Sequence, residues 1–124
     1  MASQEDLVTF IASSFRSVWA LEVLCHLRRS PEHDLSPDEL VNALRASELV
    51  IRQSLAELTA AGLALVAQDG SARYAPATAE LDRLAAAAEA RYATAPDAVR
   101  RIIVKAANPG PTAFADAFRL KGKP

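Results

Sequence analysis

The chain has 124 residues, 51% of them apolar, and a formal net charge of −1. This length suggests one domain, and the apolar share is enough to bury a core without metals or disulfides. The ordinary charged fraction of 23% excludes global disorder, and the near-neutral balance excludes an overall basic, nucleic-acid-binding composition.

Three features of the whole chain bear on its location. Cys25 is the only cysteine, so no intrachain disulfide is possible, and this fits a reducing compartment. The first residues, MASQEDLVTF, begin acidic and lack the pattern of a signal peptide. No apolar run approaches the ~18 residues of a membrane span. We therefore expect a cytoplasmic protein without a membrane contact.

A first helical region is predicted from Ser3 to about Arg29. Ser3 can cap it, and acidic residues follow in the favourable first turn. Apolar residues recur at steps of three and four, as expected for an amphipathic helix: Leu7, Phe10, Ile11, Phe15, Val18, Leu21, Leu24 and Cys25. The SSFRS stretch, residues 13–17, is expected to break this region into two helices, and SPEHD, residues 30–34, is expected to be a loop.

Two further helices are predicted after this loop. SPDEL, beginning at Ser36, combines a serine cap, proline at the first helical position and glutamate three residues after the cap, which is a specific start signal. This short helix should end near Arg45, and Ser47 can cap the next one. In the second helix Ile51, Leu55 and Leu58 form one buried stripe.

A β-hairpin is predicted after the second of these helices. Gly62 is expected to stop the helix in a left-handed conformation, and Leu63 falls where a Schellman motif places an apolar contact with Leu58. The segments LALVAQ (63–68) and SARYAP (71–76) read as short strands. The Asp69-Gly70 dipeptide between them predicts a two-residue hairpin turn.

The rest of the chain is predicted to be helical. An alanine-rich helix runs from Thr78 to about Ala93, PDAVRRIIVKAA (96–107) forms another, NPGP breaks it, and TAFADAFRL (112–120) can form a last short helix. We divide the chain into residues 1–95 and a C-terminal extension with a basic tail, residues 96–124. The extension carries six basic and two acidic residues, whereas residues 36–76 carry three arginines and five acids.

The order helix, short helix, helix ending LTAAGL, hairpin and helix resembles the winged helix-turn-helix domain, and most of all small bacterial regulators of the MarR and ArsR type. The resemblance covers roughly Phe15 to Leu84, and SLAELTAAGLALV is its most telling segment. It implies a mainly α fold with a small β-hairpin (α+β), in which the winged domain has extra N- and C-terminal helices. It is weak for function, because the fold also serves proteins that never touch DNA.

The resemblance implies that helix 47–61 enters the major groove and that side chains near its start reach the bases. If Ile51 marks the core direction, Leu49 and Gln53 point outward, Arg52 lies beside them and Val50 is lateral. Arginine can pair with guanine, glutamine with adenine, and aliphatic side chains can touch thymine methyls. Arg45 would take a phosphate, and Arg73 a phosphate or the minor groove. The expected DNA-binding residues are Arg45, Ser47, Leu49, Val50, Arg52, Gln53 and Arg73.

We therefore expect a transcriptional regulator that binds double-stranded DNA as a homodimer, with the N-terminal helix and the helices after the hairpin at the dimer seam. Three arginines in an acidic segment are few for phosphate binding. The alternative is a protein-interaction module, a co-regulator or anti-activator, which contacts its partner through Leu49 and Val50. Arg52 and Gln53 would then be a solvated helix face.

The remaining reactive residues predict no enzyme, cofactor or metal site. Cys25 reads as a small buried hydrophobe rather than a redox sensor, and it points about 100° away from its neighbour His26. His33 lies in a loop without metal-ligand spacing. Trp19 fits a core or dimer position. Arg100, Arg101 and Lys105 read first as a solvated helix face, and second as a site for an acidic partner or nucleic acid.

Overall fold

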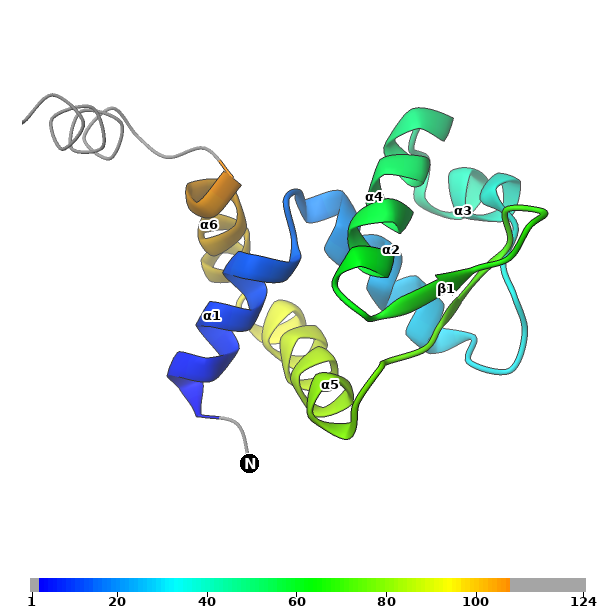
Figure 1. Ribbon diagram of the computed structural model, residues 1–124. Coiled ribbons are helices and arrows are strands. Elements are labelled where there is room, and N and C mark those ends of the chain that lie inside the picture. Colours follow the sequence, from blue (N-terminus) through cyan, green and yellow to red (C-terminus); the bar gives the residue numbers. More distant parts are fainter. Residues whose placement is uncertain (1–2, 108–124) are drawn as a thin grey trace, which may run out of the picture.

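The computed structural model describes residues 3–107, which form six helices and one two-stranded antiparallel sheet (Figure 1). The elements are α1 (Gln4–Ser14), α2 (Val18–Arg29), α3 (Pro37–Leu44), α4 (Glu48–Ala60), β1 (Ala64–Val66), β2 (Ala72–Tyr74), α5 (Ala79–Thr94) and α6 (Pro96–Ala107). The expected mainly α chain with a small hairpin is confirmed for these residues. The helix expected at 112–120 lies outside them.

Serine and threonine side chains start five of these helices, as their sequence signals predict. The hydroxyls of Ser3 and Ser36 each accept the N–H of the residue three positions on, and that residue's carboxylate accepts the serine N–H in return. Ser17, Ser47 and Thr78 cap α2, α4 and α5 in the simpler one-bond form. The break predicted at residues 13–17 is confirmed, because α1 ends at Ser14 and meets α2 at a bend of 108°.

The end of α4 is also as predicted. Gly62 has a φ of +77°, and the Leu63 N–H donates to the Leu58 carbonyl at 2.9 Å. Together with the bond from the Gly62 N–H to the Thr59 carbonyl, at 3.1 Å, this is the Schellman motif. The chain therefore leaves α4 at a fixed angle and enters β1 directly.

The predicted two-residue turn at Asp69-Gly70 is wrong. The Gly70 N–H donates to the Ala67 carbonyl at 2.9 Å, and the Ala67 N–H donates to the Ser71 carbonyl at 2.8 Å, so three residues form the loop. A two-residue turn of this sequence needs positive φ at both central residues. Gly70 alone adopts it, at +90°, and Asp69 does not. The paired strands are also shorter than expected, because the register joins only Ala64–Val66 to Ala72–Tyr74.

A third backbone segment joins the hairpin, which the sequence did not predict. Leu35 and Ala72 exchange two backbone hydrogen bonds of 2.8 Å each. The hairpin tip also lies close to the start of α3, since a Cβ on Gly70 would come within 3.3 Å of the Pro37 side chain. Both contacts fix the hairpin beside α3.

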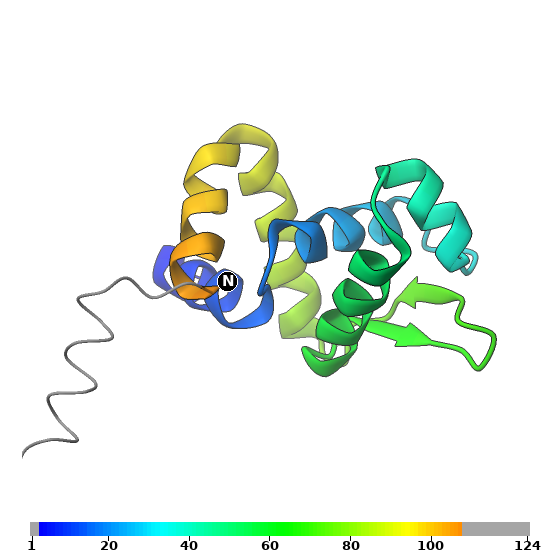
Figure 2. The ribbon, with the colours of Figure 1, turned by 90° about the horizontal axis from the view of Figure 1, so that it is seen from above.

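The helices form two groups at opposite ends of the molecule (Figures 1 and 2). At one end α1 packs against α5 and α6, and at the other α3, α4 and the hairpin gather around α2. One continuous cluster of buried apolar side chains joins the two groups and includes Ile11, Leu24, Ile51, Val99 and Ile103. The described part of the C-terminal extension is therefore packed into the same core as the rest.

Within residues 3–107, no single helix is long and apolar enough to cross a membrane, and only the bent pair α1 and α2 passes such a test together.

Candidate nucleic-acid interface

The outward face of α4 carries the side chains that the sequence assigned to base reading. Ile51 and Leu55 are buried, and this turns Leu49 and Gln53 toward solvent on the opposite side. Leu49 has 64% of its surface exposed, the largest fraction among the large apolar residues described as exposed. Ala56 is exposed on the next turn. The face is thus a shallow ridge with one apolar side chain and one amide near the start of the helix.

Two of the expected residues are less available than the helical wheel suggested. Val50 is half-buried and packs against the core. The Ser47 hydroxyl accepts the Val50 N–H at 3.1 Å, so its oxygen already caps the helix. Ser47 remains exposed and can still approach a ligand, but its main role in the fold is structural.

Arg52 is exposed, and an acidic neighbour on the same helix partly neutralises it. Its guanidinium lies 2.5 Å from the Glu48 carboxylate, one turn earlier, and both side chains are largely exposed. An exposed pair of this kind contributes little to stability. It matters for binding, because a base or phosphate would have to compete with Glu48 for the guanidinium.

Arg45 and Arg73 are exposed and form no ion pair with any residue in 3–107. Arg45 ends α3 in the left-handed region, with φ 55° and ψ 39°, and lies just before α4. Arg73 projects from β2 of the hairpin. Arg73 lines a hollow on the hairpin with Asp34 and Leu65, separate from the groove beside α4. Of these two arginines only Arg45 is adjacent to the start of α4 along the chain.

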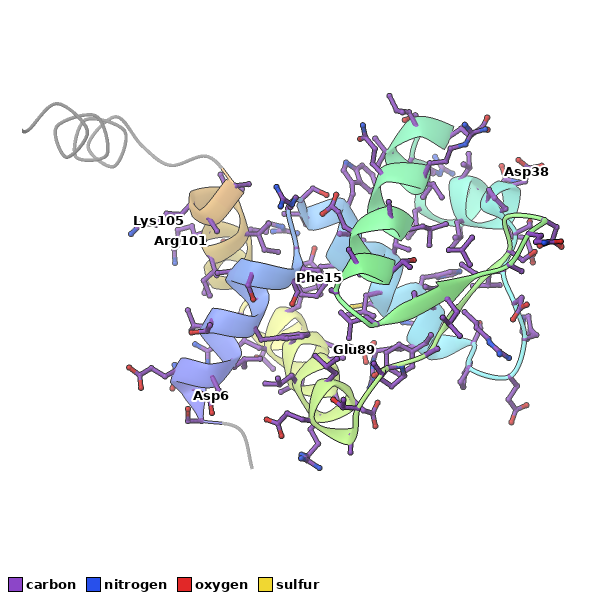
Figure 3. The ribbon with its side chains drawn as sticks, in the orientation of Figure 1. Asp6, Phe15, Asp38, Glu89, Arg101 and Lys105 are labelled. Carbon is purple, nitrogen blue, oxygen red and sulfur yellow. The ribbon has the colours of Figure 1, made fainter. Side chains whose placement is uncertain are left out.

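A groove of about 950 Å³ separates α4 from the hairpin, and we call it the α4–hairpin groove. Leu55, Ala56, Ala60 and Val66 supply apolar walls. The other lining residues, polar ones and small or cyclic ones at its ends, are Ser36, Pro37, Asp38, Glu48, Arg52, Thr59, Gln68, Asp69 and Gly70. Figure 3 shows Asp38 at the start of α3, near the hairpin tip.

The groove is acidic. Three carboxylates line it, against the single guanidinium of Arg52. The Ser71 N–H donates to the Asp69 carboxylate at 2.9 Å, and this bond holds the pKa of Asp69 below its usual value. Asp69 is therefore ionised at neutral pH. These carboxylates would repel the phosphates of a nucleic-acid strand lying between α4 and the hairpin.

The sequence contained a signal for one of these carboxylates and none for the others. Glu48 stands four residues before Arg52 on a predicted helix, the spacing at which ion pairs form. Asp38 and Asp69 come together only because the hairpin tip leans on the start of α3. Their proximity depends on tertiary structure that no local pattern encodes.

The hairpin is held to the body of the protein by Arg28, at the end of α2. Its guanidinium contacts Glu89 of α5 at 2.9 Å and Asp82 at 3.5 Å, and lies 4.9 Å from the centre of the Tyr74 ring. The Tyr74 hydroxyl donates to Asp82 at 2.6 Å. We call these four residues the Arg28 cluster. Burial, more than any other cause, raises the pKa of Tyr74 to about 12, so the phenol stays protonated.

The other reactive residues form no metal-binding group within residues 3–107. Cys25 is buried, and burial raises the pKa of its thiol to about 11. No group of three His, Cys, Asp or Glu side chains in the described chain could hold a metal ion. Trp19 is 39% exposed and lines a hollow with Tyr92 and Arg100.

Comparison of the chain with protein-family models, with curated proteins and with solved structures gives no match.

Proposed function

We propose that residues 15–84 form a winged helix-turn-helix domain and that the protein is a DNA-binding transcriptional regulator. The observation that carries this proposal is the exposed, serine-capped start of α4, which the exposed Arg45 precedes by three residues. A second exposed arginine, Arg73, lies on the hairpin. Three residues join α3 to α4, which is the usual length of the turn in a helix-turn-helix. In this arrangement α4 enters the major groove with Leu49, Arg52 and Gln53 foremost.

Each residue has a separate role in the proposal. Gln53 pairs with adenine. The Arg52 guanidinium leaves its ion pair with Glu48 and forms hydrogen bonds with guanine. Leu49 contacts a thymine methyl. Arg45 and Arg73 contact phosphates on either side of the helix. Because few cations are available, we expect weak non-specific affinity for DNA. Binding would then rely on a homodimer, whose two α4 helices would contact half-sites about one helical turn apart.

The dimer seam is proposed at α1, α5 and α6, following the family resemblance. These helices bury most of their large apolar side chains inside their own chain, including Phe10, Ile11 and Ile103. Val8 of α1 and Val104 of α6 stay exposed and are available to a second copy.

The test is selection of bound fragments from a pool of random duplex DNA at ~50 and ~200 mM salt. We expect enrichment of a repeated half-site at the lower salt, with binding that weakens steeply at the higher. Arg45→Ala and Arg73→Ala should each weaken binding to all sequences and reduce the salt dependence by about one phosphate contact. Gln53→Ala should relax the preference at one base.

A matched control is Arg29→Ala at the end of α2, which removes an exposed arginine that is neither among the proposed DNA contacts nor on a helix of the proposed dimer seam. It should leave DNA binding unchanged. Absence of binding to any duplex at ~50 mM salt would exclude the DNA-binding proposal.

A second candidate function is a protein-interaction module of the same fold. It is favoured by the exposed Leu49, the Arg52–Glu48 pair and the acidic groove. An exposed aliphatic side chain beside a neutralised arginine suits a protein contact better than a phosphate. Leu49→Asp should abolish such a contact and Arg52→Ala should not, whereas DNA recognition should depend on Arg52.

A further inference from the structure

The α4–hairpin groove has the properties of a docking site for a peptide that is both basic and apolar. Its apolar walls, Leu55, Ala56, Ala60 and Val66, come from two elements that face each other. Three carboxylates also line it: Asp38 of α3, Glu48 of α4 and Asp69 of the hairpin loop. The hairpin tip rests on Pro37, and Leu35 pairs with β2, so the groove is preformed in the free protein.

This chain contains a segment of matching chemistry. Residues 108–124 follow the end of α6 and carry Arg119, Lys121 and Lys123 against one acid, Asp116. Phe114 and Phe118 stand four residues apart, the spacing that places two side chains on one face of a helix. Two aromatic side chains followed by three cations complement an apolar groove edged by carboxylates.

The position of α6 favours a second copy as the source of this segment. α6 ends at the side of the molecule opposite the hairpin (Figures 1 and 2). An extended chain covers at most ~3.5 Å per residue, so Phe114 can lie no more than about 25 Å from Ala107. A domain of this size has a diameter of roughly 30 Å or more. A segment from another copy has no such limit.

We propose that the α4–hairpin groove binds residues 112–123 of a second copy of this chain. Phe114 and Phe118 insert between α4 and the hairpin, and the cations that follow pair with Asp38 and Asp69. Figure 3 shows that Arg101 and Lys105 of α6 point away from the body, so they neither fill nor neutralise the groove of their own chain. The observations behind this proposal do not require α4 to read DNA, although Arg52 lines the groove and also belongs to the proposed reading face.

The test uses a fluorescent peptide of residues 108–124 and the full-length Phe114→Ser/Phe118→Ser protein, whose own segment is disabled outside the described fold. Fluorescence anisotropy should show saturable binding that weakens as salt increases. Ala56→Gln, which places a longer neutral side chain in the groove, should weaken binding at least tenfold. Asp38→Asn/Asp69→Asn, which removes charge and preserves shape, should weaken it at least threefold.

Two controls separate docking from general charge attraction. Glu5→Gln/Glu32→Gln removes two exposed carboxylates outside the groove and should leave the affinity within about twofold. A peptide with both phenylalanines changed to serine should not bind. Equal affinity for the Ala56→Gln and unchanged grooves, or the absence of saturable binding, would overturn the proposal.

Light scattering then decides which copy supplies the segment. The wild-type protein should have a larger molar mass than Phe114→Ser/Phe118→Ser and Ala56→Gln at equal concentration. If the peptide binds the groove but all three proteins have the same molar mass, the groove mediates no association beyond the proposed α1–α5–α6 seam and the second-copy assignment is overturned. DNA selection with Phe114→Ser/Phe118→Ser, which leaves every residue of the groove unchanged, reports separately on the proposed regulator.

Discussion

Ser54 is the clearest local irregularity at the scale of single residues. It lies on the buried side of α4, only 1% exposed, and its hydroxyl has no hydrogen-bond partner within residues 3–107. A buried polar group without a partner is destabilising, because it has lost its bonds to water. The same helix face otherwise carries leucine and isoleucine.

We expect Ser54→Ala to raise the free energy of unfolding by up to about 1 kcal/mol. Urea unfolding measures this directly. The matched control is Ser47→Ala, which removes the cap of α4 and should lower stability by about 1 kcal/mol. A loss of more than about 1 kcal/mol in Ser54→Ala would show that the hydroxyl has a partner in solution.

Cys25 gives the protein a pH dependence at alkaline pH. Burial raises the pKa of its thiol from 9.0 to about 11, so the folded state holds the proton more tightly than the unfolded chain does. The associated stability is fully present below about pH 9 and is lost as the pH rises toward about 11. Unfolding free energies measured across this range should therefore fall with pH, and Cys25→Ala should reduce the slope.

Tyr74 contributes in the same direction at higher pH, because its pKa is raised from 10.0 to about 12. Tyr74→Phe is therefore the control that separates the two groups. A slope between about pH 9 and pH 10 that persists in Cys25→Ala would contradict the assignment to the thiol.

Side-chain directions on α4 were predictable where the helix alone decides them. Leu49 and Gln53 lie on the outward face because Ile51 is buried, and a 100° step fixes the rest. Val50 shows the limit of that reasoning. Its lateral position is half-buried only because neighbouring elements reach it, and the wheel of one helix contains no information about them.

At the scale of elements, the ends of helices were encoded locally and the hairpin was not. Ser36, Pro37 and Glu39 specify the start of α3 within four residues, and Gly62 specifies the end of α4. The loop at Gly70 depends instead on which residue takes the positive φ, and the Leu35–Ala72 pairing joins segments far apart in the chain. Tertiary packing determines both the conformation of this loop and the pairing of Leu35 with Ala72.

The Arg28 cluster determines how firmly the hairpin is held. Arg28→Met keeps part of the apolar stem of the side chain but leaves Glu89 and Asp82 without their cation. We expect this change to lower the free energy of unfolding by about 2 kcal/mol. Urea unfolding gives the magnitude, and faster amide exchange at Ala72 would locate the effect in the hairpin. Arg83→Met breaks the exposed Arg83–Glu80 pair within α5 and should change the free energy of unfolding by less than about 0.5 kcal/mol. Equal effects would contradict a special role for Arg28.

At the scale of the whole molecule, α6 is part of one core with α1 and α5. Val99 and Ile103 are fully buried, although the sequence divided the chain at residue 95. That boundary was placed where the net charge of the chain becomes positive and where Pro96 begins a new helix. Neither signal contains information about which helices pack together. The acidic groove likewise required three separate elements, and only the Glu48–Arg52 part of it was readable in advance.

We expect Ile103→Ala to lower the stability of the whole described chain by about 2–5 kcal/mol, in a single unfolding transition. Val104→Ala, at the adjacent position, which is 52% exposed, should change the free energy of unfolding by less than about 0.5 kcal/mol. Circular dichroism and tryptophan fluorescence should report the same midpoint. Two separate transitions would mean that α6 unfolds independently of the helices around α2.

Arg45 has a consequence for how this protein tolerates mutation. It is the only residue other than glycine with positive φ among residues 3–107, and glycine would hold the same conformation with about 1 kcal/mol less strain. If Arg45 binds phosphate, Arg45→Gly gives a more stable protein that regulates less well. Selection for thermal stability alone would then move this position toward glycine, and selection for DNA binding would move it back. Because the backbone at the end of α3 is left-handed at position 45, the residue found there indicates whether selection for stability or selection for DNA binding is stronger.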